Sequence, residues 1–426
     1  MFGVVSVLGV RKAERLWAEA VVGVFFCAFF CVADTFIHKE SGEILHGFAT
    51  QKQIGGRVVV RTEEKGFRRL DLSQYDISRD YQGRREEAVW ICIKGDIEYE
   101  AETAAFEKAL SDAVNKGPYV VVIEIDSCGG RVDLAVRMCE AIIRADNCQI
   151  AAFVSGGGYG GAYSSAAAAA LACEKIYMAE NTAIGAATLY VRSDAGPMDI
   201  ESFYGKDEGH EALVAFSGFF GTLAANRGRP WVLASAMVDK EMEVLEVVEE
   251  GRRDFIWPNY QKTAEQLAQR GLDANQIVEV LKKKREGSVI RTWSKQGSLL
   301  TLSAPDAIKC GIADGMVNSR TELLGVLKAD GVRILIDKTA ANARAEVEEA
   351  KIRIRRAIAS ADYRMKQLRA AKSRDYTKSV LTKIILELRD AVKLAESKPD
   401  LAYLAAELKP YLEYFDSVAE EVNHGR

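Results

Sequence analysis

A glycine-rich turn that runs directly into an alanine-rich segment constrains the fold of this 426-residue chain more than any other stretch. Five glycines fall between Gly156 and Gly161, directly after the apolar run Ile150–Val154. Glycines at such a density let the backbone bend sharply and approach another group closely. The residues from Ala162 to Cys173 contain no glycine or proline and are mostly alanine, which predicts a tightly packed helix. A strand, a sharp turn and a helix are therefore expected in this order.

Ser164 lies in the first turn of that predicted helix. The first turn of a helix leaves backbone N–H groups unpaired and carries the positive end of the helix dipole. An oxyanion that forms beside Ser164 would meet these donors, so the position suits a serine nucleophile. A packed strand, turn and helix without any chemistry is the alternative interpretation of these residues taken alone.

A second unit of the same kind comes earlier in the chain. Val120–Asp126 has the pattern of a buried strand, Ser127-Cys128-Gly129-Gly130 follows as a turn, and Val132–Arg144 has an amphipathic helical pattern. Before them, Val89–Ile93 predicts another strand and Glu102–Val114 another helix. Successive units of strand, turn and helix predict a parallel α/β sheet with its functional loops at the strand ends.

These motifs resemble those of the ClpP-like serine protease superfamily, of the signal peptide peptidase and NfeD membrane-protease type. In that family a strand ends in Asp-x-x-Gly-Gly, a serine opens an alanine-rich helix, and an acidic residue precedes a strand that closes in Ile-Gly-Ala. The matching residues here are Asp126-Ser-Cys-Gly129-Gly130, Ser164, Glu174–Ala179 and Ile184-Gly-Ala-Ala187. Farther along, Leu302–Asp314 is similar to the closing segment of the family. The resemblance covers roughly residues 88 to 328.

The resemblance implies an α/β fold, a ClpP/crotonase-like parallel sheet of repeated ββα units, to which this chain adds a C-terminal helical region. It implies a serine endopeptidase of Ser-Lys type that cleaves segments of membrane proteins or signal peptides. Ser164 is the expected nucleophile, and the N–H groups of Ser165 and of either Gly129 or Gly130 are expected to hold the oxyanion. The family's proteases also imply a homo-oligomer.

The catalytic base has two candidates in this scheme. A serine needs a histidine, or a lysine buried enough to be neutral, to accept its proton. In the family the base lies near the start of a long helix, which is expected here from about His210 to Arg227. Lys206 is the first choice and His210 the alternative, one helical turn apart. Alignment of the helix end with the family places the lysine position near Glu211, so the pair is left open.

Composition excludes several other functions. A net charge of −4 and a pI near 5.9 give no basic footprint for nucleic acid. The eight cysteines form no CxxC pair, and histidine is scarce, so neither a metal site nor a cofactor is expected. Cys92, Cys128, Cys139, Cys148 and Cys173 lie in or beside apolar segments and are expected to be buried thiols, with one or two disulfides as the alternative after export.

The N-terminal residues 1–33 carry Arg11, Lys12 and Arg15 followed by the uncharged run Ala20–Ala33. This run is shorter than the roughly 20 residues that span a bilayer, so a secretory signal is favoured over a membrane anchor. The body is accordingly expected to be exported, in the periplasm or on the outer face of the cytoplasmic membrane, with the membrane close by. Residues 34–87 are interpreted as a polar tether with at most a local hairpin, and residues 88–330 as the protease domain, with an insertion at about 239–297.

The C-terminal region, residues 331–426, has the composition of long helices. Apolar residues recur at heptad spacing at Val347, Ile354, Ala361 and Leu368, and two further helices follow, separated by Lys398-Pro399-Asp400. We expect a helical hairpin or coiled coil for self-association or partner binding. Two other functions of the same fold stay open: a catalytically silent assembly protein and, less favoured, a crotonase-type acyl-CoA enzyme.

Overall fold

The computed structural model describes residues 34–62, 66–78, 87–193, 196–258, 288–329, 331–369 and 373–424. The expected signal or anchor at residues 1–33 lies outside the described residues. Within the described part of the chain, no helix has both the length and the apolar character to cross a membrane.

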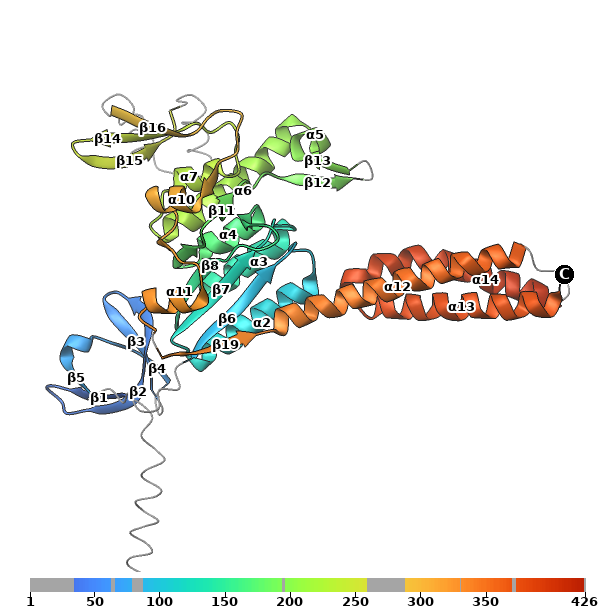
Figure 1. Cartoon of the computed structure of the whole chain (residues 1–426), viewed down its shortest axis with the longest axis horizontal. Helices are drawn as coiled ribbons and strands as arrows, with labels where there is room; N and C mark the ends of the chain where they lie inside the picture. The colour runs from blue at the N-terminus through green and yellow to red at the C-terminus, as the bar shows by residue number, and fades with distance from the viewer. Residues whose placement is uncertain are drawn as a thin grey trace, which may run out of the picture.

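A six-stranded parallel sheet forms the centre of the molecule (Figure 1). Its strands are, in spatial order, β18 (Gly315–Met316), β10 (Lys175–Met178), β8 (Gln149–Val154), β7 (Val120–Asp126), β6 (Glu87–Lys94) and β19 (Arg333–Asp337). All seven residues of β7 are buried, including Glu124 and Asp126, as the buried-strand pattern predicted for a central parallel strand. The predicted α/β class with a parallel sheet is confirmed.

Helices cover this sheet and enclose the main core. They are α2 (Glu100–Lys116), α3 (Val132–Arg144), α4 (Ser165–Ala172), α6 (Lys206–Asn226) and α7 (Trp231–Ala236). Every residue of α4 is buried, because small side chains let neighbouring elements approach it from all sides. Next to it lies a small sheet of β9 (Gly161–Tyr163), β11 (Ala183–Gly185) and β17 (Thr301–Ser303).

The polar tether expected over residues 34–87 is wrong for the part that the structure describes. Residues 34–62 and 66–78 form a five-stranded antiparallel sheet in the order β4-β3-β2-β1-β5. Its strands are β1 (Asp34–His38), β2 (Ile44–Ile54), β3 (Arg57–Thr62), β4 (Gly66–Leu70) and β5 (Tyr75–Ser78). Its buried core has only four residues, Phe36, Leu45, Val60 and Leu70, so the charged outward faces dominate the composition.

Two smaller additions lie beyond the small sheet. The first is a hairpin of β12 (Tyr190–Ser193) and β13 (Gly196–Asp199), followed by the short helix α5 (Ile200–Tyr204). The second, inside the expected insertion, is a sheet of β14 (Val244–Glu249), β15 (Arg252–Ile256) and β16 (Ser288–Ser294). Helices α10 (Ala304–Lys309) and α11 (Arg320–Val326) then lead back to the central sheet.

The C-terminal helices project from the body as an elongated bundle (Figure 1). They are α12 (Thr339–Arg369), α13 (Arg374–Glu396) and α14 (Ala402–His424), with the short turn η2 (Pro399–Leu401) at the predicted break. The predicted stripe residues Val347, Ile354 and Ala361 are buried between the helices. The expected all-helical tail is wrong at its start, because β19 belongs to the central sheet and pairs with β6.

Candidate active site

Ser164 occupies the turn between β9 and α4, as the N-cap residue of α4. Its backbone has φ 54° and ψ −133°, a conformation that residues with a side chain rarely adopt. Such strain costs on the order of 1–3 kcal/mol and persists only where the surroundings impose it. Here the Ser164 N–H donates to the Gly185 carbonyl at 3.0 Å, and the Ser164 carbonyl accepts from Ala167 at 2.9 Å. The turn therefore presents a half-buried serine at the start of a buried helix.

Gly129 lies directly against the Ser164 side chain. A Cβ atom on Gly129 would fall 2.5 Å from the Ser164 Cβ and 3.0 Å from its Oγ, and the φ of Gly129 is +95°. Only glycine therefore fits between the two loops. The structure thus brings Ser164, at the start of α4, against the loop Ser127–Gly130 after β7, which we call the Gly-Gly loop. The order of the motifs in the sequence predicted this arrangement.

Two N–H groups beside Ser164 are available to an oxyanion. Among the described residues, no hydrogen bond uses the N–H of Gly130 or of Ser165, whereas the Gly129 N–H donates to Ser127 Oγ at 3.0 Å. Ser165 is fully buried, and its hydroxyl donates to the Gly130 carbonyl at 3.0 Å. The Ser165 side chain thus ties the start of α4 to the Gly-Gly loop and leaves the exposed hydroxyl of the pair to Ser164.

The glycine-rich turn between β8 and β9 is held by the carboxylate of Asp126. This carboxylate accepts from the N–H of Tyr159 at 3.3 Å and of Gly160 at 3.0 Å. A Cβ atom on Gly157 would fall 2.3 Å from Asp126 Oδ2, so the turn needs glycine to close around the carboxylate. Asp126 is thus a structural anchor for the turn that leads to Ser164.

Sequence reasoning missed Asp96, which lies between the predicted strand Val89–Ile93 and the predicted helix Glu102–Val114. Its carboxylate lies 2.8 Å from Cys128 Sγ and 3.1 Å from the hydroxyl of Tyr159, so it connects the Gly-Gly loop with the glycine-rich turn. Its backbone carbonyl accepts from Arg344 of α12 at 2.6 Å. Arg344 also pairs at 2.8 Å with Glu102, and burial raises the pKa of that carboxyl to about 7 even though the guanidinium lowers it.

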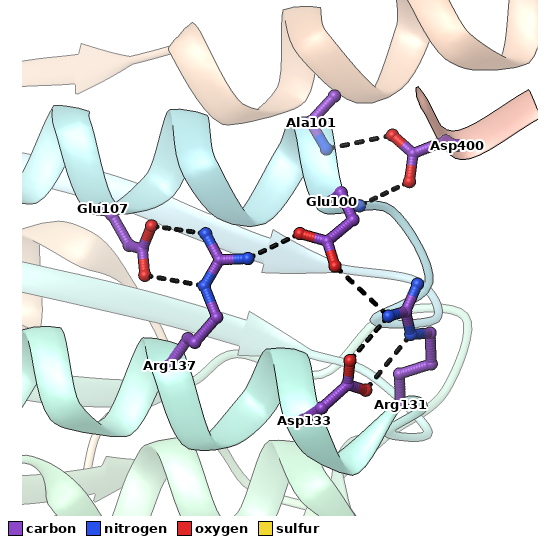
Figure 2. Close-up of polar contacts among 7 residues, drawn as sticks. All are labelled: Glu100, Ala101, Glu107, Arg131, Asp133, Arg137 and Asp400. Atoms are coloured by element: carbon purple, nitrogen blue, oxygen red, sulfur yellow. Dashed lines mark hydrogen bonds and ion pairs between the residues drawn. The ribbon is translucent and has the colours of Figure 1, made fainter. Parts of the chain in front are cut away.

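A polar network joins the bundle to the same region (Figure 2). Both carboxylate oxygens of Asp400, in η2, accept from the first two backbone N–H groups of α2, at 2.6 and 3.0 Å. The Glu100 carboxylate in that turn contacts Arg131 at 3.2 Å and Arg137 at 2.5 Å, and Arg137 also pairs with Glu107 at 2.7 Å. Because Arg131 directly follows Gly130, the bundle is connected to the loop beside Ser164.

The two candidate bases lie on α6. Lys206 is exposed in the first turn of the helix, and the His210 side chain, 45% exposed, has its Nδ1 3.5 Å from Glu201 Oε1 of α5. Among the described residues, no hydrogen bond joins Ser164 Oγ to either of them. Glu211, at the position where the family alignment places lysine, is also exposed. The structure brings the serine and the glycine loops together but not a base.

Most of the cysteines in the described residues are buried free thiols. Cys139, Cys148 and Cys173 are buried free thiols as predicted, whereas Cys92 is only partly buried and Cys128 is exposed on the loop after β7. Burial raises the pKa of the Cys148 thiol to about 12. Within the described part of the chain, no three His, Cys, Asp or Glu residues gather in a way that could hold a metal ion.

Comparison with known proteins gave one family and a set of distant folds. A family model described as NfeD1b, N-terminal domain, matches residues 88–289. Among solved structures, a mutant of the 1510-N membrane-bound stomatin-specific protease is similar at 15% identity and a TM-score of 0.39, over 59% of this chain and 98% of the other. The 1510-N membrane protease specific for a stomatin homolog from Pyrococcus horikoshii is 17% identical, with a TM-score of 0.34, over 59% and 93%.

ClpP1 from Listeria monocytogenes is 13% identical, with a TM-score of 0.27, over 55% of this chain and 94% of the other. No curated protein matches the chain. The family match spans β6 to the start of β16 and thus contains the Gly-Gly loop, the glycine-rich turn and Ser164. Residues 88–289 therefore match the model of the NfeD1b N-terminal domain, in agreement with the resemblance of the motifs to the ClpP-like and NfeD-type proteases.

Proposed function

We propose that this chain is a serine endopeptidase in which Ser164 is the nucleophile. The observation that carries the proposal is the strained backbone of Ser164, at φ 54° and ψ −133°, with the bare Gly129 against its side chain. A buried helix of small residues has no structural need for a strained polar residue at its start. Strain of this kind is concentrated at functional sites, where it presents a reactive group.

The proposed reaction follows from the groups around that hydroxyl. Ser164 Oγ attacks the peptide carbonyl carbon and its proton passes to a base, so the carbonyl oxygen gains the negative charge. The unpaired N–H groups of Ser165 and Gly130 stabilise this oxyanion. The C–N bond then breaks, and the leaving amine takes the proton from the base. Water next attacks the acyl-enzyme and gives a proton to the base, which passes it to Ser164 Oγ as the acid product leaves.

Lys206 is the proposed base, and it needs to move to reach Ser164. Lysine accepts a proton efficiently only when it is removed from water, and in this structure Lys206 is exposed. The hairpin β12–β13 and α5 directly precede Lys206, so closure of this segment over the Gly-Gly loop, or contact with a second subunit, would bury the amine. His210 is the alternative base, and it would have to leave Glu201.

The same proposal places the enzyme outside the cytoplasm and close to the membrane. It rests on the charge pattern of residues 1–33 and on the motif resemblance, which also gives the substrate class: segments of membrane proteins or of signal peptides. A reporter that works only in the cytoplasm, fused after the last helix, should be inactive. Activity of this fusion would contradict the proposed location without affecting the chemistry proposed for Ser164.

A fluorophosphonate probe tests the nucleophile directly. We expect the full chain to be labelled, Ser164→Ala to abolish labelling, and Ser165→Ala to retain it at a lower rate, because the loop then loses one hydrogen bond. Lys206→Ala and His210→Ala separate the bases: loss of labelling in one and retention in the other identifies the residue that accepts the proton. Labelling that persists in Ser164→Ala overturns the assignment.

A catalytically silent assembly protein is the second candidate. The observation in its favour is that, among the described residues, no hydrogen bond joins Ser164 Oγ to a lysine or histidine. If the chain is unlabelled across the alkaline range, where a lysine base is neutral, and Ser164→Ala folds like the parent chain, the serine is a relic and the fold serves assembly.

A further inference from the structure

The strand β19 is an edge strand whose two faces are both exposed. It pairs with β6 on one side and, among the described strands, has no neighbour on the other. Ile334, Leu335 and Ile336 are 36%, 37% and 40% exposed, although residues of the adjacent β6, such as Trp90 and Ile91, are fully buried. Three successive exposed aliphatic residues therefore line the outer edge of the central sheet.

Soluble proteins rarely leave such an edge uncovered. The outer side of an edge strand presents unpaired N–H and C=O groups, and natural sequences protect it with proline, a bulge or charges within the strand. The sequence Arg333-Ile-Leu-Ile-Asp337 has none of these in its centre and carries its charges only at its two ends. An edge built in this way is suited to accept another strand.

We propose that β19 pairs with β19 of a second copy of this chain, antiparallel and centred on Leu335, so that two central sheets join into one. In that register Leu335 faces Leu335 of the second copy, Ile334 faces Ile336, and Arg333 faces Asp337. Aliphatic residues meet aliphatic residues and opposite charges meet at both ends, each of which stabilises a cross-strand pair. A shift of the register by two residues breaks both charge pairs.

The existing contacts of the end residues are compatible with this pairing. Arg333 pairs with Glu87 of β6 through one nitrogen, and a guanidinium has further donors to offer to Asp337 of the second copy. Asp337 accepts from the Thr339 N–H at 2.7 Å through one oxygen, which leaves the other free for arginine. The sequence of β19 is complementary to itself in the antiparallel direction, which favours a second copy of this chain as the partner at this edge. Any other partner would need the same order of charges.

The pairing is independent of the proposed hydrolysis, because β19 contributes no residue to the Ser164 site. An interface of one short strand from each copy is small, so we expect a dimer that dissociates on dilution. The bundle begins two residues after β19, so each copy would carry its own bundle away from the shared sheet.

Sedimentation of the full chain over a concentration series tests the dimer. Leu335→Glu places two carboxylates opposite each other and is expected to weaken the dimer by about tenfold or more in dissociation constant. Leu386→Glu, at a 51% exposed leucine of α13, is the matched control and should leave the dimer unchanged. A chain that stays monomeric at all concentrations, or a dimer that Leu335→Glu does not weaken, overturns the proposal.

Disulfide trapping tests the register. Directly opposed residues of antiparallel strands have Cα atoms about 4.5–5.5 Å apart, within the range of a disulfide. Leu335→Cys should therefore cross-link to itself under oxidation, above the level of the parent chain with its native cysteines. Ile334→Cys and Ile336→Cys should each fail alone and cross-link when the two variants are mixed. Cross-linking of Ile334→Cys to itself would contradict the proposed register.

Discussion

Removal of the Asp400 carboxylate should loosen the first turn of α2. The N-cap residue of this helix, Tyr99, makes no side-chain capping bond, so Asp400 from the bundle supplies the cap in its place. Loss of an N-cap costs about 0.5–2 kcal/mol, and loss of a carboxylate at the positive end of a helix about 0.3–1 kcal/mol. We therefore expect Asp400→Ala to lower the opening free energy of this turn by about 2 kcal/mol, and Asp400→Asn by about half of that.

Native-state hydrogen exchange measures this quantity amide by amide. Protection should fall at Glu100–Thr103, and by a smaller amount at Arg131, which the Glu100 carboxylate contacts. Asp390→Ala, which removes an exposed carboxylate from α13, is the control and should change neither segment. If the exchange of α2 in Asp400→Ala is the same as in the control, the bundle does not hold this turn and the connection to the Gly-Gly loop is refuted.

Three further predictions test other parts of the structure. Gly129→Ala should lower the free energy of unfolding by about 2–4 kcal/mol and abolish labelling of Ser164, because the added Cβ would meet the serine and the φ of this residue is positive. Gly158→Ala is the control and should change neither property, because the space around Gly158 is open. Thermal unfolding measures the stability of both variants, and the fluorophosphonate probe measures their labelling. Burial raises the pKa of Glu102 from 4.5 to about 7, so the folded chain holds a proton there that the unfolded chain releases, and stability falls as pH rises between these values. Glutamine cannot release a proton, so the free energy of unfolding of Glu102→Gln should escape about 3 kcal/mol of this fall. Urea unfolding should therefore show a difference between the variant and the parent chain that increases from pH 4.5 to pH 8. Phe36→Ala should cost about 3–5 kcal/mol in the N-terminal sheet, measured as faster proteolysis of residues 34–78, and an unchanged rate would mean that this sheet has no stable core.

Local patterns predicted the elements of the central sheet closely. The bounds of β7 and α3 agree with the predicted strand and helix, because β7 is a short run rich in β-branched residues that ends before two glycines and α3 has the apolar period of a helix. Ser164 was expected in the first turn of a helix and is the N-cap of α4. In each case the information lies within a few residues of the element.

Features that depend on distant parts of the chain were not predictable. The N-terminal sheet has a core of four residues among charged strands, so its composition resembled a tether. The contact between Arg344 and the carbonyl of Asp96 joins residues 248 positions apart, and no periodicity reports such a pair. The base stayed open for the same reason, since its distance from Ser164 depends on how the hairpin before α6 lies.

Because β19 comes late in the sequence, the nascent chain has to wait for the partner of β6. About 240 residues separate the end of β6 from Arg333, which a ribosome needs roughly ten to fifty seconds to synthesise. During that time the flank of β6 that β19 will cover has no partner, although the remaining strands of the parallel sheet are already available. Thus β19, the last strand of the parallel sheet to be synthesised, covers the free side of β6, the first. A polypeptide that terminates before Arg333 would present Val89 and Ile91 along an uncovered edge.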